Sequence, residues 1–204
     1  MNRPWRPLKK LPHILDDFRK NLDTVKFQSV NLYFQDESRF GLMTHVGKCL
    51  TSIGVKPITT YKHAFKSTYL YGSFSPINGD AFIYEIEGTT SEIFYKYLLE
   101  FSKHKPKELK VIIIDNAGFH SLKQYKLPEN IKLIRIPPYT PELNPAEKIW
   151  HYIKQYFKNK AFDDLQKLKE WLHNFINENL GNEIVKSITH NKFFIDTFMG
   201  HYEI

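Results

Sequence analysis

The sequence predicts an α/β fold in which a mixed β-sheet is flanked by helices. Period-two apolar patterns, which are typical of strands, come first and extend from residue 30 to residue 86. Helical patterns are then interleaved with a run of β-branched residues and follow one another to the C-terminus. With 204 residues, of which 42% are hydrophobic, the chain can bury the core that such a fold needs.

The first 26 residues differ from the rest of the chain. They contain a basic segment interrupted by prolines, followed by Ile14, Leu15, Phe18 and Leu22 at helical spacing. We expect an arm or linker with a short helix over residues 1–26, and one domain over residues 27–204. An ordinary N-terminal extension is the alternative.

The first strand is predicted from the alternation that starts at Val30, and it is expected to end at Asp36, on the same face as the apolar residues. Four more candidate strands follow, at residues 40–48, 55–61, 67–75 and 80–86. The turn residues at 76–80 predict that the last two strands form a hairpin.

The second half predicts a helix over 89–104 and then a strand ending at Asp115, whose four consecutive β-branched residues favour a central parallel position. One more strand is expected at 131–136. A helix is expected at 144–158, where Asn144 would be the N-cap and Pro145 the first helical residue, and another at 163–179, where Asp163 would be the N-cap. A short helix and irregular chain are expected over 182–204.

Composition narrows the class of protein. The formal net charge of +7 favours a polyanionic partner such as nucleic acid or an anionic membrane surface. The single cysteine, Cys49, excludes an intramolecular disulfide and a cysteine-rich zinc site. Because neither a membrane span nor a secretory signal is apparent, we expect an intracellular protein, and the many Lys, Asn, Ile, Phe and Tyr residues suggest a bacterial source.

Three acidic residues lie where chemistry is expected. Asp36 and Asp115 follow strands, and Glu147 lies in the first turn of a helix. If the two strands are parallel neighbours, their carboxylates point into one crevice, which the helix could complete. Three hard oxygen ligands suit two Mg²⁺ or Mn²⁺ ions, which catalyse phosphodiester chemistry. Each acid also has a plain alternative: the two aspartates could belong to turns, and Glu147 could close a capping box with Asn144.

Three sequence motifs contain these acids. In chain order they are Phe34-Gln-Asp36-Glu-Ser-Arg39-Phe40, Ile114-Asp115-Asn116-Ala-Gly-Phe-His120 and Pro137-Pro-Tyr-Thr-Pro141-Glu-Leu-Asn144-Pro145-Ala-Glu147-Lys-Ile-Trp150. Together they resemble the catalytic domain of mariner-like DDE transposases of bacterial insertion sequences, over roughly residues 28–180. The third motif, which contains Glu147, is the most specific of the three for this family.

The resemblance implies a ribonuclease-H-like fold with Asp36, Asp115 and Glu147 as catalytic metal ligands. It implies cleavage of DNA at the terminal inverted repeats of an element and strand transfer into target DNA, typically at TA. A homodimer acting in the bacterial cytoplasm, on the nucleoid, is expected. Asn116 and His120 match family positions beside the second aspartate, where they would support a metal ligand or contact DNA, although a purely structural His120 is equally open.

The chain departs from the family pattern in two ways. The loop between Asp115 and Glu147 is a little shorter than usual, and 26 residues cannot hold the helix-turn-helix region that reads the inverted repeat in family members. We expect a truncated chain, a split-frame product with a separately encoded helix-turn-helix partner, or a decayed gene.

Basic residues recur along the helix that follows Glu147. Lys148, His151, Lys154 and Lys158 would form one face and could follow a phosphate backbone, although an ordinary solvated face is the alternative. Trp150 could contact bases, but its spacing favours the core. The competing functions are another ribonuclease-H-like nuclease, such as a junction resolvase, and a non-catalytic DNA-binding or dimerisation module derived from a transposase.

Overall fold

The computed structural model describes residues 11–20, 23–44, 48, 51–56, 58, 64–137 and 143–200. In this part of the chain the elements are α1 (Leu11–Lys20), β1 (Ser29–Gly41), β2 (Ser67–Phe74), β3 (Ala81–Ile86), α2 (Ser91–Lys103), β4 (Glu108–Ile114), the short 3-10 helix η2 (Gly118–His120), β5 (Ile131–Arg135), α3 (Ala146–Phe157), α4 (Leu165–Asn179), α5 (Asn182–Ile188) and α6 (Lys192–Met199).

The strands form one mixed sheet, as the sequence predicts. Their order is β3-β2-β1-β4-β5. The pairs β1–β4 and β4–β5 are parallel, whereas β1–β2 and β2–β3 are antiparallel. The predicted hairpin is the β2–β3 pair, and its turn contains Gly79 at a φ of +74°. A Cβ atom at Gly79 would lie 1.9 Å from the carbonyl oxygen of Asn182, so glycine is required there.

The prediction that Asp36 ends the first strand is wrong. β1 continues to Gly41, because its second half pairs with β2 after its pairing with β4 has stopped at Phe34. Asp36 therefore lies inside the strand, directly opposite Gly72. It does lie on the same face as Leu32 and Phe34, as the alternation predicts.

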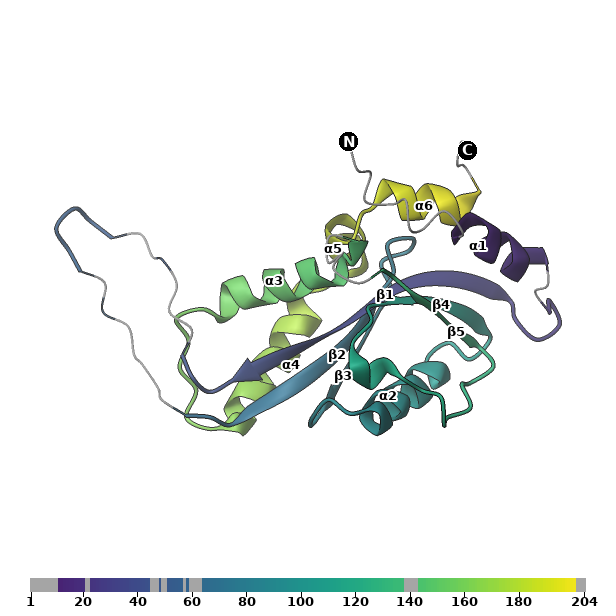
Figure 1. The fold of residues 1–204 in the computed structure, drawn as a ribbon. Coiled ribbons are helices and arrows are strands. Elements are labelled where there is room, and N and C mark those ends of the chain that lie inside the picture. Colours follow the sequence, from purple (N-terminus) through teal and green to yellow (C-terminus); the bar gives the residue numbers. More distant parts are fainter. Residues whose placement is uncertain are drawn as a thin grey trace.

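The sheet separates two hydrophobic cores. On one face, α1, α3, α4, α5 and α6 cover the sheet, and on the other face α2 does so (Figure 1). Helix α1 belongs to the larger core, since Leu15 is buried there, and it lies beside α6. β4 is buried along its whole length between the two cores, as its β-branched run predicts.

The predicted helices of the second half are present, with small differences at their ends. Thr90 caps α2, and its hydroxyl accepts a hydrogen bond from the backbone N–H of Ile93. The cap of α4 is Asp164 and not Asp163, because the Asp164 carboxylate accepts from the backbone N–H of Lys167 at 2.8 Å. The C-terminal segment contains two helices, α5 and α6, where one was expected.

Two predicted strands are not present in the described residues. Within the candidate strands 40–48 and 55–61, only residues 40 and 41 are in a strand, as the end of β1, and the other described residues are irregular. The remaining residues of both candidates, and residues 1–10 of the expected arm, lie outside the described residues. Within the described part of the chain, no helix is both long and apolar enough to cross a membrane.

Candidate active site

The parallel pair β1–β4 brings the two predicted aspartates to the same edge of the sheet. Asp115 directly follows β4, and Asp36 lies two residues beyond Phe34, the last β1 residue that pairs with β4. Both side chains are thus at the carboxyl end of neighbouring parallel strands, where ligand sites of open α/β sheets form.

Helix α3 brings Glu147 toward this edge through the buried side chain of Asn144. The Asn144 amide donates to the backbone carbonyl of Gln35 at 2.9 Å, next to Asp36. Its oxygen accepts from the backbone N–H of Ala146, the first residue of the helix, at 3.2 Å. The N-cap position is Pro145 and not Asn144 as predicted, so the helix begins one residue later than expected. One side chain therefore ties the first turn of α3, which carries Glu147, to β1.

A glycine lets the same helix approach the sheet closely. A Cβ atom on Gly72 would lie 2.5 Å from the ring of Phe74 and 2.8 Å from the ring of Trp150. Gly72 is the cross-strand partner of Asp36, so the close contact between Gly72 and Trp150 determines how near α3 lies to the part of the sheet that contains Asp36. Trp150 is only 3% exposed, which confirms its interpretation as a core residue.

A pocket of about 350 Å³ lies between β1 and α3. It is lined by Asp36, Glu37, Ser38, Glu147, Trp150, His151 and Lys154. The first and third predicted metal ligands therefore share one pocket with two residues of the predicted basic stripe.

The carboxylates influence one another electrostatically. Burial is the largest cause that raises the pKa of Asp36, to about 8. The negative charges of Glu37, Glu147 and Asp115 raise it further, while a backbone hydrogen bond at Glu37 partly offsets them. Asp36 is thus close enough to both Glu147 and Asp115 to be repelled by them, and a cation beside Asp36 would relieve this repulsion.

His120 bridges Asp115 to a second acid, Glu37. The Nδ1 atom of His120 lies 2.8 Å from Oδ1 of Asp115, and its Nε2 atom lies 3.1 Å from Oε1 of Glu37. Burial alone would lower the pKa of His120, but the bonds and charges of the two carboxylates outweigh it and raise the pKa to about 9. The hydrogen bond from His120 in turn lowers the pKa of Asp115.

Sequence reasoning did not identify Glu37. Its side chain is 10% exposed and also accepts a hydrogen bond from the Gln35 amide at 2.8 Å. The partner His120 is 83 residues away, so no local pattern connects the two. The available signal was an acid directly after Asp36 together with a histidine shortly after Asp115.

Asn116 and Arg135 fix the backbone around Asp115. The Asn116 amide donates to the backbone carbonyl of Ile136, which joins the segments that follow β4 and β5. The Arg135 guanidinium donates to the carbonyl oxygens of Asp115 and His120. Of the two predicted supporting residues, His120 contacts the Asp115 carboxylate, whereas the amide of Asn116 is directed to the neighbouring strand end.

The donor set fits hard divalent cations. Asp36, Asp115 and Glu147 offer carboxylate oxygens alone, which Mg²⁺ and Mn²⁺ prefer. Within the described residues, no three His, Cys, Asp or Glu side chains already stand as a cluster that could hold an ion. Mutually repelling carboxylates are expected to stay apart until a cation binds between them.

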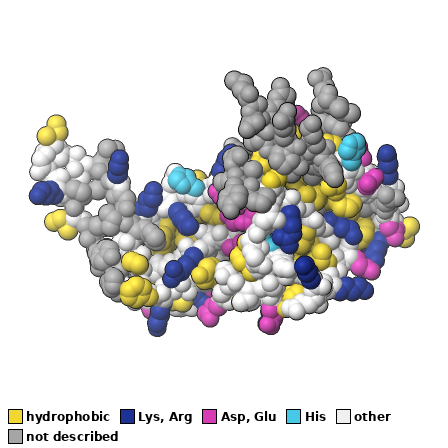
Figure 2. Space-filling view, in the orientation of Figure 1, with side chains coloured by type: hydrophobic (Ala, Val, Ile, Leu, Met, Phe, Trp, Pro, Cys, Tyr) yellow, Lys and Arg dark blue, Asp and Glu magenta, His cyan; other side chains and the backbone are white. Residues whose placement is uncertain are grey.

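The predicted basic stripe lies on the solvent side of α3. Its four members are all exposed: Lys148, His151, Lys154 and Lys158. The ammonium of Lys154 lies 5.6 Å from the centre of the Phe40 ring, where partial burial lowers its pKa and the charge of Asp36 opposes this effect. On the face of the molecule that Figure 2 shows, Lys and Arg side chains lie on either side of a group of acidic side chains near the middle.

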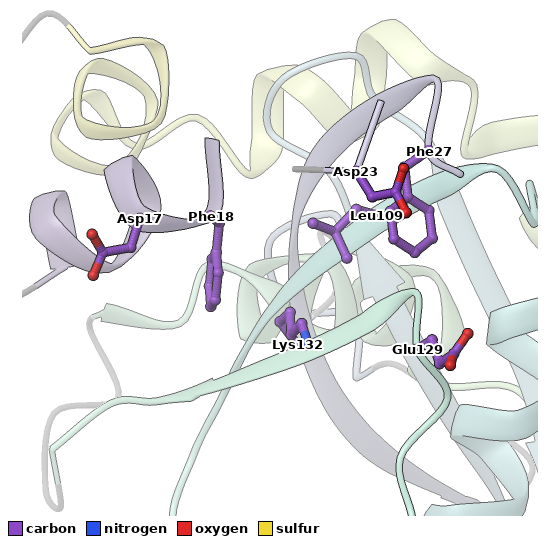
Figure 3. A pocket seen from close by; sticks show the side chains of 7 residues that line it. All are labelled: Asp17, Phe18, Asp23, Phe27, Leu109, Glu129 and Lys132. Carbon is purple, nitrogen blue, oxygen red and sulfur yellow. The ribbon is translucent and has the colours of Figure 1, made fainter. Parts of the chain in front are cut away.

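A second hollow, of about 370 Å³, lies between α1 and the edge of the sheet (Figure 3). Phe18 reaches toward it from α1, and Leu109 and Lys132 lie near the starts of β4 and β5. It is therefore at the opposite end of β4 from Asp115 and takes no part in the candidate site.

Comparisons with known proteins agree with this geometry. Residues 31–169 match the family described as DDE superfamily endonuclease. The protein y4pE/y4sA of Sinorhizobium fredii (strain NBRC 101917 / NGR234) is 31% identical over 98 residues, which are 47% of this chain and 73% of that protein.

Solved structures of the Mos1 transposase are similar in fold. The mariner paired-end complex with Mn superposes with a TM-score of 0.64 at 14% identity, covering 100% of this chain and 64% of that one. The strand transfer complex gives a TM-score of 0.62 at 15% identity, covering 99% and 62%. The chain thus spans less than two thirds of the Mos1 chains, and the likeness confirms the ribonuclease-H-like fold. Since the family match covers more than half of the sequence and includes all three predicted ligands, the chain belongs to the DDE superfamily endonuclease family.

Proposed function

We propose that this chain is the catalytic domain of a DNA transposase that cuts DNA at the ends of its element and joins them to target DNA. The observation that carries the proposal is the convergence of β1, β4 and α3 on one edge of the sheet. The influence of both Asp115 and Glu147 on the pKa of Asp36 supports a shared site for the three carboxylates.

In this proposal the three carboxylates hold two Mg²⁺ or Mn²⁺ ions. When bound, such a pair activates the attacking water or 3′-hydroxyl and stabilises the leaving oxygen at phosphorus. The carboxylates would hold the ions, and His120 would restrain Asp115 through its contact with the carboxylate. Lys154 and His151, which line the same pocket, would bind the phosphate backbone, with Lys148 and Lys158 extending the contact along α3.

The partners that we propose are DNA and a second copy of this chain. The similar structures are described as paired-end and strand transfer complexes, and two of them as complexes with Mn and Mg. From the resemblance of its sequence motifs to mariner-like transposases, we propose terminal inverted repeats and a TA target as DNA substrates. We further propose that the chain acts as a homodimer on the nucleoid of a bacterial cytoplasm.

Nicking of a supercoiled plasmid in the presence of Mn²⁺ tests the reaction. We expect the parent protein to nick the plasmid, and Asp115→Ala to reduce the rate by at least roughly 100-fold, because bound metals contribute several kcal/mol to the transition state. Asp163→Asn, which changes an exposed acid ahead of α4, is the matched control and should cut as the parent does.

Three outcomes separate the alternatives. Loss of nicking in Asp115→Ala with an active control supports the proposal. Equal nicking by Asp115→Ala and the parent would contradict the assignment of the three carboxylates. DNA binding without nicking by the parent would favour a non-catalytic DNA-binding module.

A further inference from the structure

We propose that Glu37 is a positioning residue which, through His120, holds Asp115 in the orientation that metal binding needs. The inference rests on the proposed function and adds a residue to it. Its basis is the bridge Glu37–His120–Asp115, which crosses from β1 to the segment after β4.

The bridge is directional at both ends of the imidazole ring. Nδ1 of His120 is 2.8 Å from the Asp115 carboxylate and 3.3 Å from the Asp115 backbone carbonyl. Nε2 is 3.1 Å from Glu37. Because each ring nitrogen faces an acid, rotation of the ring would break both contacts, so Glu37 fixes the orientation in which His120 meets Asp115.

The ring is also confined by its neighbours. His120 is 1% exposed, and its ring centre lies 4.3 Å from that of Phe94 on α2 and 4.4 Å from that of Phe119. The packing restricts translation of the ring, while the Glu37 carboxylate determines which nitrogen faces Asp115. The two restraints are therefore complementary.

Glu37 itself is firmly held. It is the neighbour of Asp36 on β1, and the alternation of the strand places the two side chains on opposite faces of the sheet. Its Oε1 atom also accepts from the Gln35 amide at 2.8 Å. One short segment of β1 thus supplies one proposed metal ligand, Asp36, and the anchor for a second one, Asp115.

The contacts leave Asp115 able to bind an ion. His120 and the backbone N–H of Ala117, at 2.9 Å, both contact Oδ1 of Asp115. Binding through Oδ2 would leave both contacts in place. Buried ion pairs are weak contributors to net stability compared with apolar packing, whereas hydrogen-bonded partners of metal ligands strongly affect metal affinity. This difference favours a positioning role over a purely structural one.

Direct Mn²⁺ binding, measured by calorimetry on the full chain, tests the inference without depending on catalysis. We expect Glu37→Ala to weaken Mn²⁺ affinity by about 10- to 100-fold. Glu37→Gln, whose amide oxygen can still accept from His120, should restore most of the affinity. Glu85→Gln, on β3 and paired with Lys169, is the control and should bind as the parent does.

Asp36→Asn and Asp115→Asn separate this inference from the proposed function. If both lose Mn²⁺ binding while Glu37→Ala keeps the parent affinity, the positioning role is wrong and the metal site stands. If both keep the parent affinity, the metal site itself is wrong. Thermal unfolding in chelator shows which variants fold; if Glu37→Ala does not, His120→Gln replaces it, and an unchanged affinity there would equally contradict the inference.

Discussion

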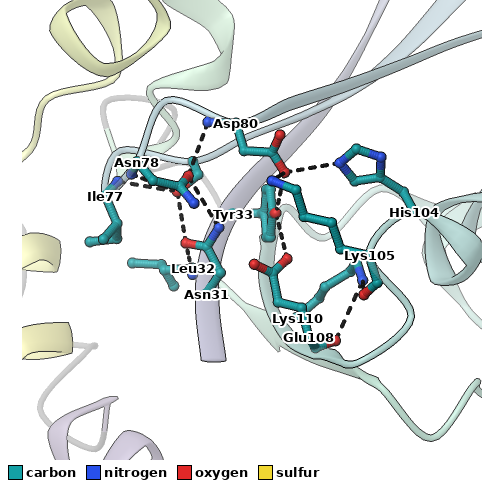
Figure 4. Close-up of polar contacts among 11 residues, drawn as sticks. Asn31, Leu32, Tyr33, Ile77, Asn78, Asp80, His104, Lys105, Glu108 and Lys110 are labelled. Carbon is teal, nitrogen blue, oxygen red and sulfur yellow. Dashed lines mark hydrogen bonds and ion pairs between the residues drawn. The ribbon is translucent and has the colours of Figure 1, made fainter. Parts of the chain in front are cut away.

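Lys110 is a buried lysine whose ammonium group is stabilised by contacts with its immediate surroundings. It lies near the start of β4, in a polar network at the end of the sheet away from the candidate site (Figure 4). Its ammonium donates to the carbonyl oxygens of Lys105 at 3.0 Å and Glu108 at 3.4 Å, and lies 5.4 Å from the centre of the Phe101 ring. These contacts satisfy the group without fully compensating for its removal from water.

A pH dependence of stability follows from this burial. Burial lowers the pKa of Lys110 to about 8, although the charges of Glu108 and Asp80 raise it in part. An unfolded lysine titrates near a pKa of about 10.4. Between these values the unfolded chain binds the additional proton, so this group makes the free energy of unfolding rise with pH from about 8 to about 10.

Urea unfolding of the parent and of Lys110→Met at pH 7.5, 8.5 and 9.5 measures the effect. The stability of the parent relative to Lys110→Met should increase across this series. Lys107→Met, which changes an exposed lysine just ahead of β4, should follow the parent. A constant difference between parent and Lys110→Met would show that the buried amine does not titrate in this range.

Among the elements, α3 determines whether the third carboxylate reaches the other two. Its buried face contains Ile149, Trp150 and Ile153, so it packs on the sheet and leaves the basic residues toward solvent. Packing alone permits the helix to slide, whereas the Asn144 hydrogen bond to Gln35 fixes its first turn beside Asp36. The same side chain also accepts from the backbone N–H of Ala146, so it contacts both β1 and the start of α3.

Asn144→Ala should therefore affect both stability and cleavage. It removes two hydrogen bonds of a buried side chain, which we expect to lower the free energy of unfolding by about 1–3 kcal/mol. Nicking in Mn²⁺ should fall as well, because Glu147 loses its fixed distance from Asp36. Asn177→Ala, on the exposed side of α4, is the control; cleavage at the parent rate by folded Asn144→Ala would rule out the anchoring role.

Elements defined by local patterns could be predicted, and those defined by distant pairing could not. The β-branched run of β4 predicts a buried strand, and the apolar stripe of α2 predicts a helix, from local sequence alone. The end of β1 is set by its antiparallel partner β2, which lies beyond a long connection, so the alternation around Asp36 could not reveal it. The cap of α4 was misassigned by one residue, because Asp163 and Asp164 are chemically equivalent candidates.

For the whole molecule, the sheet order explains how distant residues form one site. β1 lies between β2 and β4, so it meets the parallel half of the sheet on one side and the antiparallel hairpin on the other. The sequence motifs predicted Asp36 in β1, Asp115 directly after β4 and Glu147 in α3, which are far apart along the chain. The bridge between Glu37 and His120 was not predicted, because it joins residues 83 positions apart that only the folded sheet brings together.

Anomalous diffraction from crystals of the chain grown with Mn²⁺ tests the shared metal site most directly. We predict two peaks roughly 3.5–4 Å apart, with Asp36, Asp115 and Glu147 all within bonding distance of one peak or the other. Peaks that avoid these carboxylates, or a Glu147 carboxylate beyond bonding distance of both peaks, would contradict the account.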